Sequence, residues 1–395
     1  MLVGRVARPM PAPPVFAGPL LEDNGTFDHV ILGAGLAGLS LVWYLLERNI
    51  RERVLLVDSR LEFANDRTWC FWDVESTPFN DLATHSWCRW EVSDEVGTVV
   101  SSSRRYRYLR LRAADFYQRV LERVRQSPYV TLALGTAVLS WTEGPEAVVI
   151  ETDKGQVRGA RVADALARRT SEPTMLQHFL GQHVRTERPV FDPTCAVLMD
   201  FRVSQTDGPH FFYVLPLAAD QALVENTYLF PCEVGLERHR AEIAGYMRQR
   251  YGIDPDGFDV LDEERGAIPM TARHHPARVG RRVYPIGLAG GAARPSSGYA
   301  FLRTQRQTRH LARQLMTGRA DKDPGGISGP KHRRLDEVFL RVLKARPRKA
   351  PVIFRQLFAR ADADSLVRFL GERSTPLDDV RVLAALPKRP FFETK

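Results

Sequence analysis

The segment from Phe27 to Asp58 constrains the fold of this chain more than any other part of the sequence. An apolar run, Val30-Ile31-Leu32, leads into three glycines with G-x-G-x-x-G spacing, and a helix-forming stretch then extends to about Arg48. A second apolar run ends at Asp58, about 20 residues after the last glycine. A strand, a glycine turn, a helix and a second strand that ends in an acid predict a Rossmann-type βαβ unit.

The three glycines have separate tasks in such a unit. Gly33 permits the tight turn, Gly35 lets the backbone approach a pyrophosphate, and Gly38 lets the helix pack closely on the strand. The phosphates would lie at the helix N-terminus, where unpaired N–H groups and the helix dipole favour negative charge. Asp58 can accept hydrogen bonds from ribose hydroxyls. We therefore predict a bound dinucleotide in preference to a purely structural glycine turn.

The composition is that of a globular protein of one elaborate or two modest domains, with 395 residues of which 44% are hydrophobic. The four cysteines are scattered without CxxC spacing, which argues against a disulfide framework and fits a reducing cytoplasm. Residues 1–26 are rich in proline and lack the apolar core of a secretion signal, so we expect a flexible N-terminal arm. We expect no segment that spans a bilayer, although the protein can still lie on one.

The net charge of +9 is compatible with three readings: a solvated surface, an anionic membrane or nucleic acid. Basic residues are denser at Arg104–Arg112 and Lys331–Lys349. No recognition motif for nucleic acid accompanies them, so we expect no nucleic-acid partner. The histidines and cysteines lack metal-ligand spacing, and there is neither a G-x-S-x-G motif nor a cysteine nucleophile signature. We therefore expect neither a metal site nor a hydrolase.

Beyond Asp58 the pattern of residues predicts further elements. Residues Asn65–Trp72 are polar and then irregularly aromatic, which favours a loop. A helix is expected from Leu111 to Val124 and another from about Glu233 to Tyr251. Short strands are expected at Val130–Leu134, Ala147–Glu151, Arg161–Leu166, Ala196–Val203, Phe211–Leu215, Leu223–Leu229 and Val283–Ile286, with breaks at Asp207-Gly208-Pro209 and at Pro216. Further helices are expected at Tyr299–Met316, Leu335–Ala345, Val352–Arg360 and Asp364–Glu372.

Glu225 is the sharpest candidate for chemistry, because it lies on an apolar strand between Leu223 and Tyr228. A carboxyl group buried among such neighbours has a raised pKa, and it can act as a general acid near neutral pH. The alternative is that Glu225 alternates outward into water, and the sequence alone leaves both readings open.

Two other segments could line a site. Glu263 and Glu264 precede Arg265–Met270, a turn-like segment that lines a pocket or lies on the surface. The turn Gly287–Gly291 and the following Arg294–Phe301 suit a backbone cradle that leads into a helix N-terminus and holds a phosphate or ring edge of the cofactor. The alternative for this second segment is a structural turn.

These pieces, in this order and spacing, resemble the lycopene cyclase family of carotenoid biosynthesis along most of the chain. The pieces that carry the resemblance are the N-terminal fingerprint, Asn65–Trp69, Gln177–Gly181, Phe191–Pro193, Met199–Phe201, Tyr213–Leu217, Leu223–Thr227, Gly266–Met270 and Pro295–Tyr299. In that family a segment Leu-x-Glu-acid-Thr is associated with the catalytic acid. Glu225 occupies the first acidic position, but the second is Asn226, so Glu225 takes the role alone and Glu264 is a secondary candidate.

The resemblance implies a flavoprotein that cyclises the ψ-ends of lycopene, or another linear carotene, to β-ionone rings without net redox change. FAD in its reduced form would steady the cation, with NAD(P)H as the reductant, and the rings of Trp69, Phe71 and Trp72 could shelter the charge. A cytoplasmic protein at the membrane surface is implied, with other carotenoid-pathway enzymes as further partners. The residues expected at the cofactor are Gly33, Gly35, Gly38, Asp58, Arg67, Gly287, Gly291, Pro295, Gly298 and Tyr299.

The implied fold is α/β, as in flavin hydroxylases and glutathione reductase. We expect a Rossmann-like FAD-binding domain of residues 27–175 and 283–325, an antiparallel β-sheet substrate domain of residues 176–282, and a helical C-terminal region of residues 326–395. Three alternatives share part of this pattern: an FAD-dependent monooxygenase or halogenase, a geranylgeranyl-type prenyl-chain reductase, and a non-enzymatic carotenoid- or flavin-binding protein. The first usually has Gly-Asp at the second flavin contact, where this chain has Gly287-Leu288.

Overall fold

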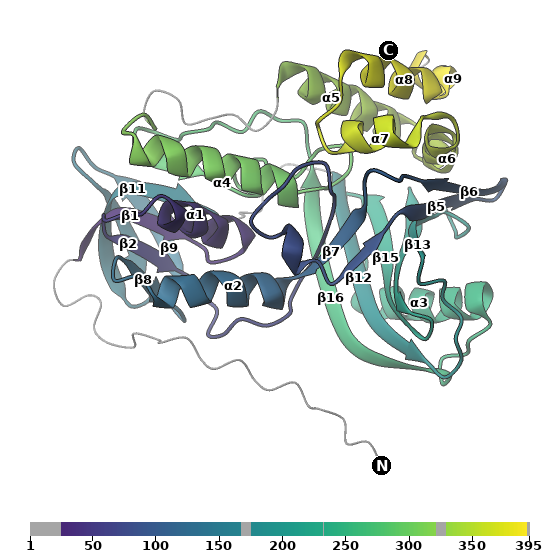
Figure 1. The fold of residues 1–395 in the computed structure, drawn as a ribbon, viewed down its shortest axis with the longest axis horizontal. Coiled ribbons are helices and arrows are strands. Elements are labelled where there is room, and N and C mark those ends of the chain that lie inside the picture. The colour runs from purple at the N-terminus through teal and green to yellow at the C-terminus, as the bar shows by residue number, and fades with distance from the viewer. Residues whose placement is uncertain (1–24, 167–174, 232, 321–328, 393–395) are drawn as a thin grey trace.

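The computed structural model describes residues 25–166, 175–231, 233–320 and 329–392 (Figure 1). Residues 1–24 of the expected N-terminal arm lie outside the described residues. The described residues form an α/β fold with two large sheets, one small sheet and a group of C-terminal helices. The predicted class, a Rossmann-like domain with a second β-sheet and a helical C-terminal region, is confirmed.

The first sheet contains the predicted βαβ unit. Its strands, in spatial order, are β8 (Val130–Ala133), β2 (Val54–Val57), β1 (Thr26–Leu32), β11 (Gly155–Asp164), β10 (Val148–Thr152) and β9 (Val138–Glu143), and β17 (Val283–Pro285) also pairs with β11. β1 is parallel to β2 and to β11, and all four residues of β2 are buried, as expected for strands covered on both faces. Helices α1 (Leu36–Glu47), α2 (Ala113–Arg125) and α4 (Phe301–Met316) lie against it (Figure 1).

The second sheet is mostly antiparallel. Its strands, in spatial order, are β16 (Phe258–Met270), β12 (Met175–Thr186), β15 (Gln221–Phe230), β14 (His210–Ala218), β13 (Cys195–Asp200), β5 (Arg89–Asp94) and β6 (Gly97–Ser102). Helix α3 (Leu236–Tyr251) covers one face of this sheet (Figure 1). The opposite face is therefore left to form a site with the rest of the molecule.

A small sheet and the C-terminal helices complete the fold. The small sheet contains β3 (Thr68–Trp72), β7 (Tyr108–Arg112) and β4 (His85–Trp87), and the 3-10 turn η1 (Asn80–Leu82) precedes β4. The C-terminal elements are α5 (Pro330–Ala345), η2 (Pro347–Lys349), α6 (Ala350–Arg360), α7 (Ala363–Leu370), α8 (Pro376–Ala385) and α9 (Lys388–Phe392). Helix α6 packs on β5 and β6, and the helices lie above that end of the second sheet (Figure 1).

Three local predictions were wrong because strand pairing overrides the local pattern, and one helix begins later than expected. Thr68–Trp72, expected in a loop, is a strand because β7 pairs with it residue by residue. Arg265–Met270, expected as a turn-like segment, forms the end of β16, and Glu263 and Glu264 lie in the same strand just before it. β14 continues through Pro216 to Ala218 by means of a register shift at that point. Helix α3 begins at Leu236, three residues later than expected.

The expected division into domains remains a prediction. Strands β5 and β6 lie within residues 27–175 of the chain, yet they belong to the second sheet, where β5 pairs with β13 and β6 pairs with β5. Helices α8 and α9 were not predicted. α8 has a clear start signal in retrospect, because Thr375 and Asp378 form a capping box around Pro376 at the first turn.

Candidate active site

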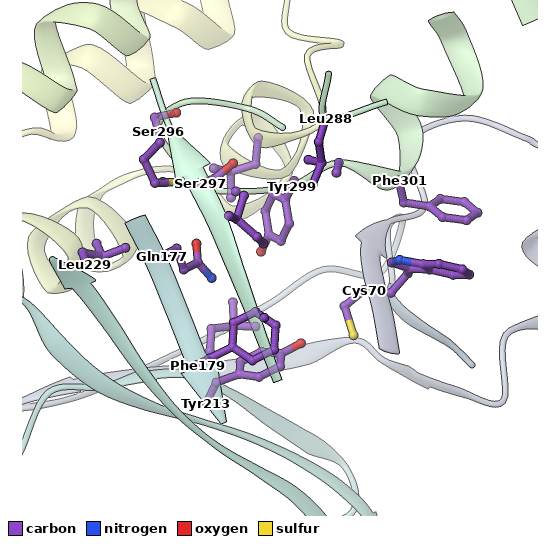
Figure 2. Close-up of a pocket in the computed structure, with 18 of the residues that line it drawn as sticks. Cys70, Gln177, Phe179, Tyr213, Leu229, Leu288, Ser296, Ser297, Tyr299 and Phe301 are labelled. Carbon is purple, nitrogen blue, oxygen red and sulfur yellow. The ribbon is translucent and has the colours of Figure 1, made fainter. Parts of the chain in front are cut away.

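A cavity of about 550 Å³ lies where the first sheet, the second sheet and the C-terminal helices meet. The start of α1 lines one side of it, and the face of the second sheet opposite α3 lines another. Figure 2 shows Phe179 and Tyr213 on the sheet, with Tyr299 and the Ser296–Ser297 turn facing them and Cys70 at the side. The C-terminal helices close the remaining side with apolar residues that include Leu335, Val338, Phe339, Phe354, Leu357, Phe358, Phe369, Leu383 and Phe391.

The glycine turn has the geometry of an anion site. Gly33 has a φ of 97°, and a Cβ on Gly38 would lie 1.9 Å from the Gly33 carbonyl oxygen, so only glycine fits at both positions. The first turn of α1 has no side-chain cap and no acidic residue. Gly35, Leu36 and Ala37 line the cavity. An uncapped helix N-terminus that opens into a cavity fits a phosphate group.

Asp58 supports this turn from behind. Its Oδ2 accepts a hydrogen bond of 2.6 Å from the backbone N–H of Ala34, and its Oδ1 accepts bonds from the backbone N–H and Nε of Arg60 at 2.8 and 3.0 Å. The carboxylate is buried and does not line the cavity. The expected acid therefore holds the glycine turn in shape. Arg60 and Arg67 line the cavity next to it and provide positive charge.

Only some residues of the second predicted cradle line the cavity. Gly287, Gly298 and Tyr299 line the cavity, whereas Gly291 and Pro295 are not among its lining residues. Gly287 has a φ of 61°, and a Cβ there would lie 2.6 Å from the Cβ of Ala37 on α1. The missing side chain therefore allows the two cavity-facing turns to touch. The start of α4 also lines the cavity and has neither a side-chain cap nor an acidic residue in its first turn.

Four residues form one row across the cavity face of the second sheet. On neighbouring strands, Tyr213 of β14 is paired with Glu225 of β15, Glu225 with Gly181 of β12, and Gly181 with Glu264 of β16. Residues paired directly across antiparallel strands point to the same face. Tyr213, Glu225 and Glu264 all line the cavity. The two predicted catalytic candidates are thus brought together although 39 positions separate their numbers in the chain.

Glu225 points into the cavity and is only 8% exposed, so the outward-facing alternative is wrong. Burial raises the pKa of its carboxyl group to about 8, and the charge of Glu264 adds to the rise. The Thr227 hydroxyl donates a hydrogen bond of 2.6 Å to Oε1, which opposes the rise. A pKa of about 8 favours the protonated, neutral form of Glu225 at pH 7, which is the form that a proton donor needs.

Glu264 is buried to the same degree, with 7% exposure. Burial raises its pKa above the ordinary value, and the Thr68 hydroxyl and the positive charges of Arg110 and Arg67 oppose that rise. Its Oε2 accepts no hydrogen bond from any described residue. A buried carboxylate oxygen without a protein partner, on the wall of a cavity, is available to a substrate.

Asn226, which departs from the family motif, lies on the opposite face of the sheet. It is fully buried beneath α3, where Oδ1 lies 2.6 Å from Nε2 of His210 and Nδ2 donates a 2.7 Å hydrogen bond to Glu242. The position expected to hold the second acid therefore has no access to the cavity in this chain.

Aromatic rings line the cavity in a different set from the one expected. Trp69 lines it, but Phe71 stacks on Phe301 with ring centroids 4.3 Å apart and Trp72 packs on Trp90, and neither lines the cavity. Tyr213 instead donates a 3.1 Å hydrogen bond to the Tyr108 hydroxyl, and Tyr299 lies against Tyr108. Sequence reasoning missed Tyr108, because only the pairing of β7 with β3 and β4 places it there.

A family model described as "Lycopene cyclase protein" matches residues 28–395. The chain belongs to the lycopene cyclase family. Membership of this family supports carotene cyclisation as the activity and a linear carotene as the substrate. Among the similar proteins is the lycopene beta-cyclase of Pantoea ananas, which is 26% identical over 386 residues, with 93% of this chain and 96% of that protein covered.

Solved structures similar to this family member share its fold. A geranylgeranyl bacteriochlorophyll reductase-like protein from Thermoplasma acidophilum matches with a TM-score of 0.63 at 11% identity, covering 93% of this chain and 98% of the other. Aklavinone-11 hydroxylase, solved with FAD and aklavinone, matches with a TM-score of 0.58 at 15% identity, covering 81% and 69%. At these identities the likeness concerns the fold, which is one that FAD-dependent enzymes use.

Two further features of the described residues bear on function. No set of three His, Cys, Asp or Glu side chains in the described ranges is arranged to hold a metal ion. Within the same ranges, none of the helices has the length and apolar character needed to cross a bilayer.

Proposed function

We propose that this protein is a lycopene beta-cyclase that closes the ψ-ends of lycopene, or of another linear carotene, into β-ionone rings by acid catalysis. Family membership supports the cyclisation of a carotene. The single observation that supports the acid mechanism is the carboxyl group of Glu225, which is buried, faces the cavity and has a pKa raised to about 8. An apolar cavity with a neutral acid on its wall suits a hydrocarbon substrate.

The reaction begins when Glu225 delivers its proton to the terminal double bond of the ψ-end. The resulting tertiary cation is attacked by the neighbouring double bond of the chain, which closes the ring and moves the positive charge onto it. Loss of one ring proton then forms the ring double bond. One proton enters and one leaves, so product and substrate are isomers and no electrons are transferred.

The cofactor of this proposal is FAD, held at the start of α1 by the Gly33–Gly38 turn and by Gly287, Gly298 and Tyr299 of the second cradle. Asp58, Gly291 and Pro295 would support these turns from behind, and Arg67 would add positive charge next to the phosphates. When bound and reduced, FAD supplies negative charge that stabilises a cation in a site sheltered from water. NAD(P)H is the proposed reductant, needed to load electrons onto FAD and not consumed in each turnover.

The tyrosines beside Glu225 stabilise the same charge. Tyr213 is next to Glu225 on the neighbouring strand, and the buried Tyr108 and the half-buried Tyr299 complete a cluster of rings on the cavity wall. The face of an aromatic ring attracts a cation by about 0.5–2 kcal/mol. Trp69, one of the expected rings, also lines the cavity. Trp69 and the tyrosine cluster are therefore proposed to stabilise the cation together.

A membrane-surface location in the cytoplasm follows from the C-terminal helices in this proposal. Val338 of α5 and Leu383 of α8 line the cavity and are also solvent-exposed, so the apolar wall continues to the protein surface. Residues 326–395 contain 16 Lys and Arg against 8 Asp and Glu, an excess of 8 in a chain whose net charge is +9. A basic surface next to an apolar opening suits contact with an anionic bilayer that holds the carotene. Other carotenoid-pathway enzymes that supply the carotene are proposed as further partners.

Expression in a bacterial host that accumulates lycopene, followed by pigment chromatography, tests this function. We expect β-carotene or γ-carotene to replace lycopene. Unchanged lycopene in the presence of folded, flavin-loaded protein would contradict the proposal. A saturated product with stoichiometric loss of NAD(P)H would identify a prenyl-chain reductase, and an oxygenated or halogenated product a monooxygenase or halogenase.

A further inference from the structure

Gly181 lies between the two cavity-facing glutamates and has no side chain to separate them. Its backbone pairs with Glu225 on one side and with Glu264 on the other, so the three residues share one row of the sheet. Neighbouring strands lie about 4.8 Å apart, and a side chain at the middle position would normally fill the space between its two neighbours.

The carbon atoms of the glutamates occupy that space. A Cβ built on Gly181 would lie 3.3 Å from Cγ of Glu264 and 3.7 Å from Cβ of Glu225. It would also lie 3.0 Å from Cδ1 of Leu223, which closes the same gap from the β15 side. The Cγ of Glu264 therefore lies next to bare backbone at Gly181, and a methyl group at position 181 would push it aside by a few tenths of an ångström.

The surroundings of the two carboxyl groups differ in charge. Burial raises the pKa of Glu225 to about 8, with the charge of Glu264 as an added cause. Burial also raises the pKa of Glu264, but the Thr68 hydroxyl and the charges of Arg110 and Arg67 oppose that rise. The positive charges beside Glu264 favour its ionised form, so for a pair that shares one proton we place the proton on Glu225 and the charge on Glu264. This division gives the two carboxyl groups two roles.

We propose that Gly181 is a positioning residue that lets Glu225 and Glu264 act as an acid–base pair within one row of the sheet. Glu225 gives its proton to the terminal double bond, and Glu264, as the carboxylate, takes the ring proton whose loss forms the ring double bond. The proton then passes from Glu264 to the ionised Glu225, which restores the starting state. Protons balance over the cycle, and no other reactant is needed.

This inference rests on the proposed cyclisation, so its test has one arm that needs no substrate. The variants are Gly181→Ala, Glu264→Gln, the double variant, and Gly97→Ala as the matched control, because a Cβ at Gly97 of β6 meets nothing within 4 Å. A Cβ at Gly181 requires its neighbours to move by only a few tenths of an ångström, so we expect all the variants to fold and to retain FAD.

The first arm measures the cyclisation rate of the reduced holoenzyme. We expect Gly181→Ala and Glu264→Gln each to lower the rate at least about tenfold, and the double variant to lie within about twofold of Glu264→Gln, because Gly181 acts through Glu264. Gly97→Ala should keep the wild-type rate. Losses that multiply in the double variant would overturn the proposal.

The second arm measures melting temperature against pH, with and without Glu225→Gln. A raised folded pKa means that the stability contribution of Glu225 is present below about pH 4.5 and is lost as the pH rises toward 8. Glu225→Gln should therefore melt above wild type at pH 8 and close to it at pH 5. We expect Gly181→Ala to reduce this difference in melting temperature at pH 8. In a background that already carries Glu264→Gln, we expect Gly181→Ala to reduce the difference no further.

In the second arm, a change in melting temperature caused by Gly181→Ala that is the same with Glu264 and with Glu264→Gln would overturn the proposed pairing of the two glutamates. If the melting arm shows the coupling while wild-type holoenzyme leaves lycopene unchanged, the pairing holds and the proposed function fails. If cyclisation occurs but neither arm shows coupling, the function holds and this inference fails.

Discussion

Glu225 and Asn226 are neighbours on β15, yet their side chains lie in different environments on opposite faces of the second sheet. Glu225 faces the cavity, whereas Asn226 is hydrogen-bonded to Glu242 beneath α3. The alternation of a strand produces this separation. A motif with two consecutive acids can therefore place only one of them at the substrate on this strand, and the acid that joins Glu225 in the cavity is Glu264 of β16.

Replacing Glu225 by glutamine should abolish cyclisation while leaving flavin content unchanged. Loss of a general acid typically lowers the rate by about 10²–10⁴-fold. The measurement is the rate of ring formation by purified, reduced holoenzyme. Glu263→Gln is the matched control, because Glu263 is paired with Arg240 at 2.7 Å and is not part of the cavity wall. Retained activity in Glu225→Gln would move the acid elsewhere.

The rate should fall as the pH rises through about 8. The pKa of Glu225 is raised to about 8, so the proton that starts the reaction is present below that pH and lost above it. A profile of kcat/KM between pH 6 and pH 10, with the flavin kept reduced, checks this prediction. A rate that stays level through pH 9, with FAD still bound, would show that the donor is not a carboxyl group with this pKa.

Restoring the acid of the family motif with Asn226→Asp should lower stability and leave the rate per folded molecule unchanged. The new carboxylate would lose the hydrogen bond that Nδ2 donates to Glu242 at 2.7 Å and would place two negative charges side by side in a buried site. The expected loss is about 3 kcal/mol near neutral pH. Chemical denaturation of both proteins measures it. A faster cyclisation would contradict the placement of this residue.

Gly38→Ala should deprive the protein of FAD. The new Cβ would fall 1.9 Å from the Gly33 carbonyl oxygen, which forces α1 away from the turn that faces the phosphates. The ratio of flavin to protein absorbance in the purified sample measures the loss. Gly245→Ala in α3 is the control, because a Cβ there meets nothing within 4 Å and alanine favours a helix by about 1 kcal/mol. Full flavin content in Gly38→Ala would refute this account of the turn.

The parts of the fold that the sequence predicts are those with strong local signals. The βαβ unit is one, because its apolar runs, glycine spacing and terminal acid all lie within Phe27–Asp58. The strand that bears Glu225 is another. The position of Glu264 in a strand was not predictable, because β16 is polar along much of its length and is held by its pairing with β12. Tyr108 and the burial of Asn226 likewise depend on contacts between distant segments.

The most direct test of the central claim, a proton-driven cyclisation without electron transfer, is one anaerobic turnover in D2O with the flavin spectrum recorded. The holoenzyme is equilibrated in D2O, reduced, mixed with lycopene, and the carotene is analysed by mass spectrometry. We predict one deuterium in the first ring that each enzyme molecule forms and a flavin that remains reduced. Rings without deuterium, or oxidation of the flavin in step with product formation, would contradict the claim.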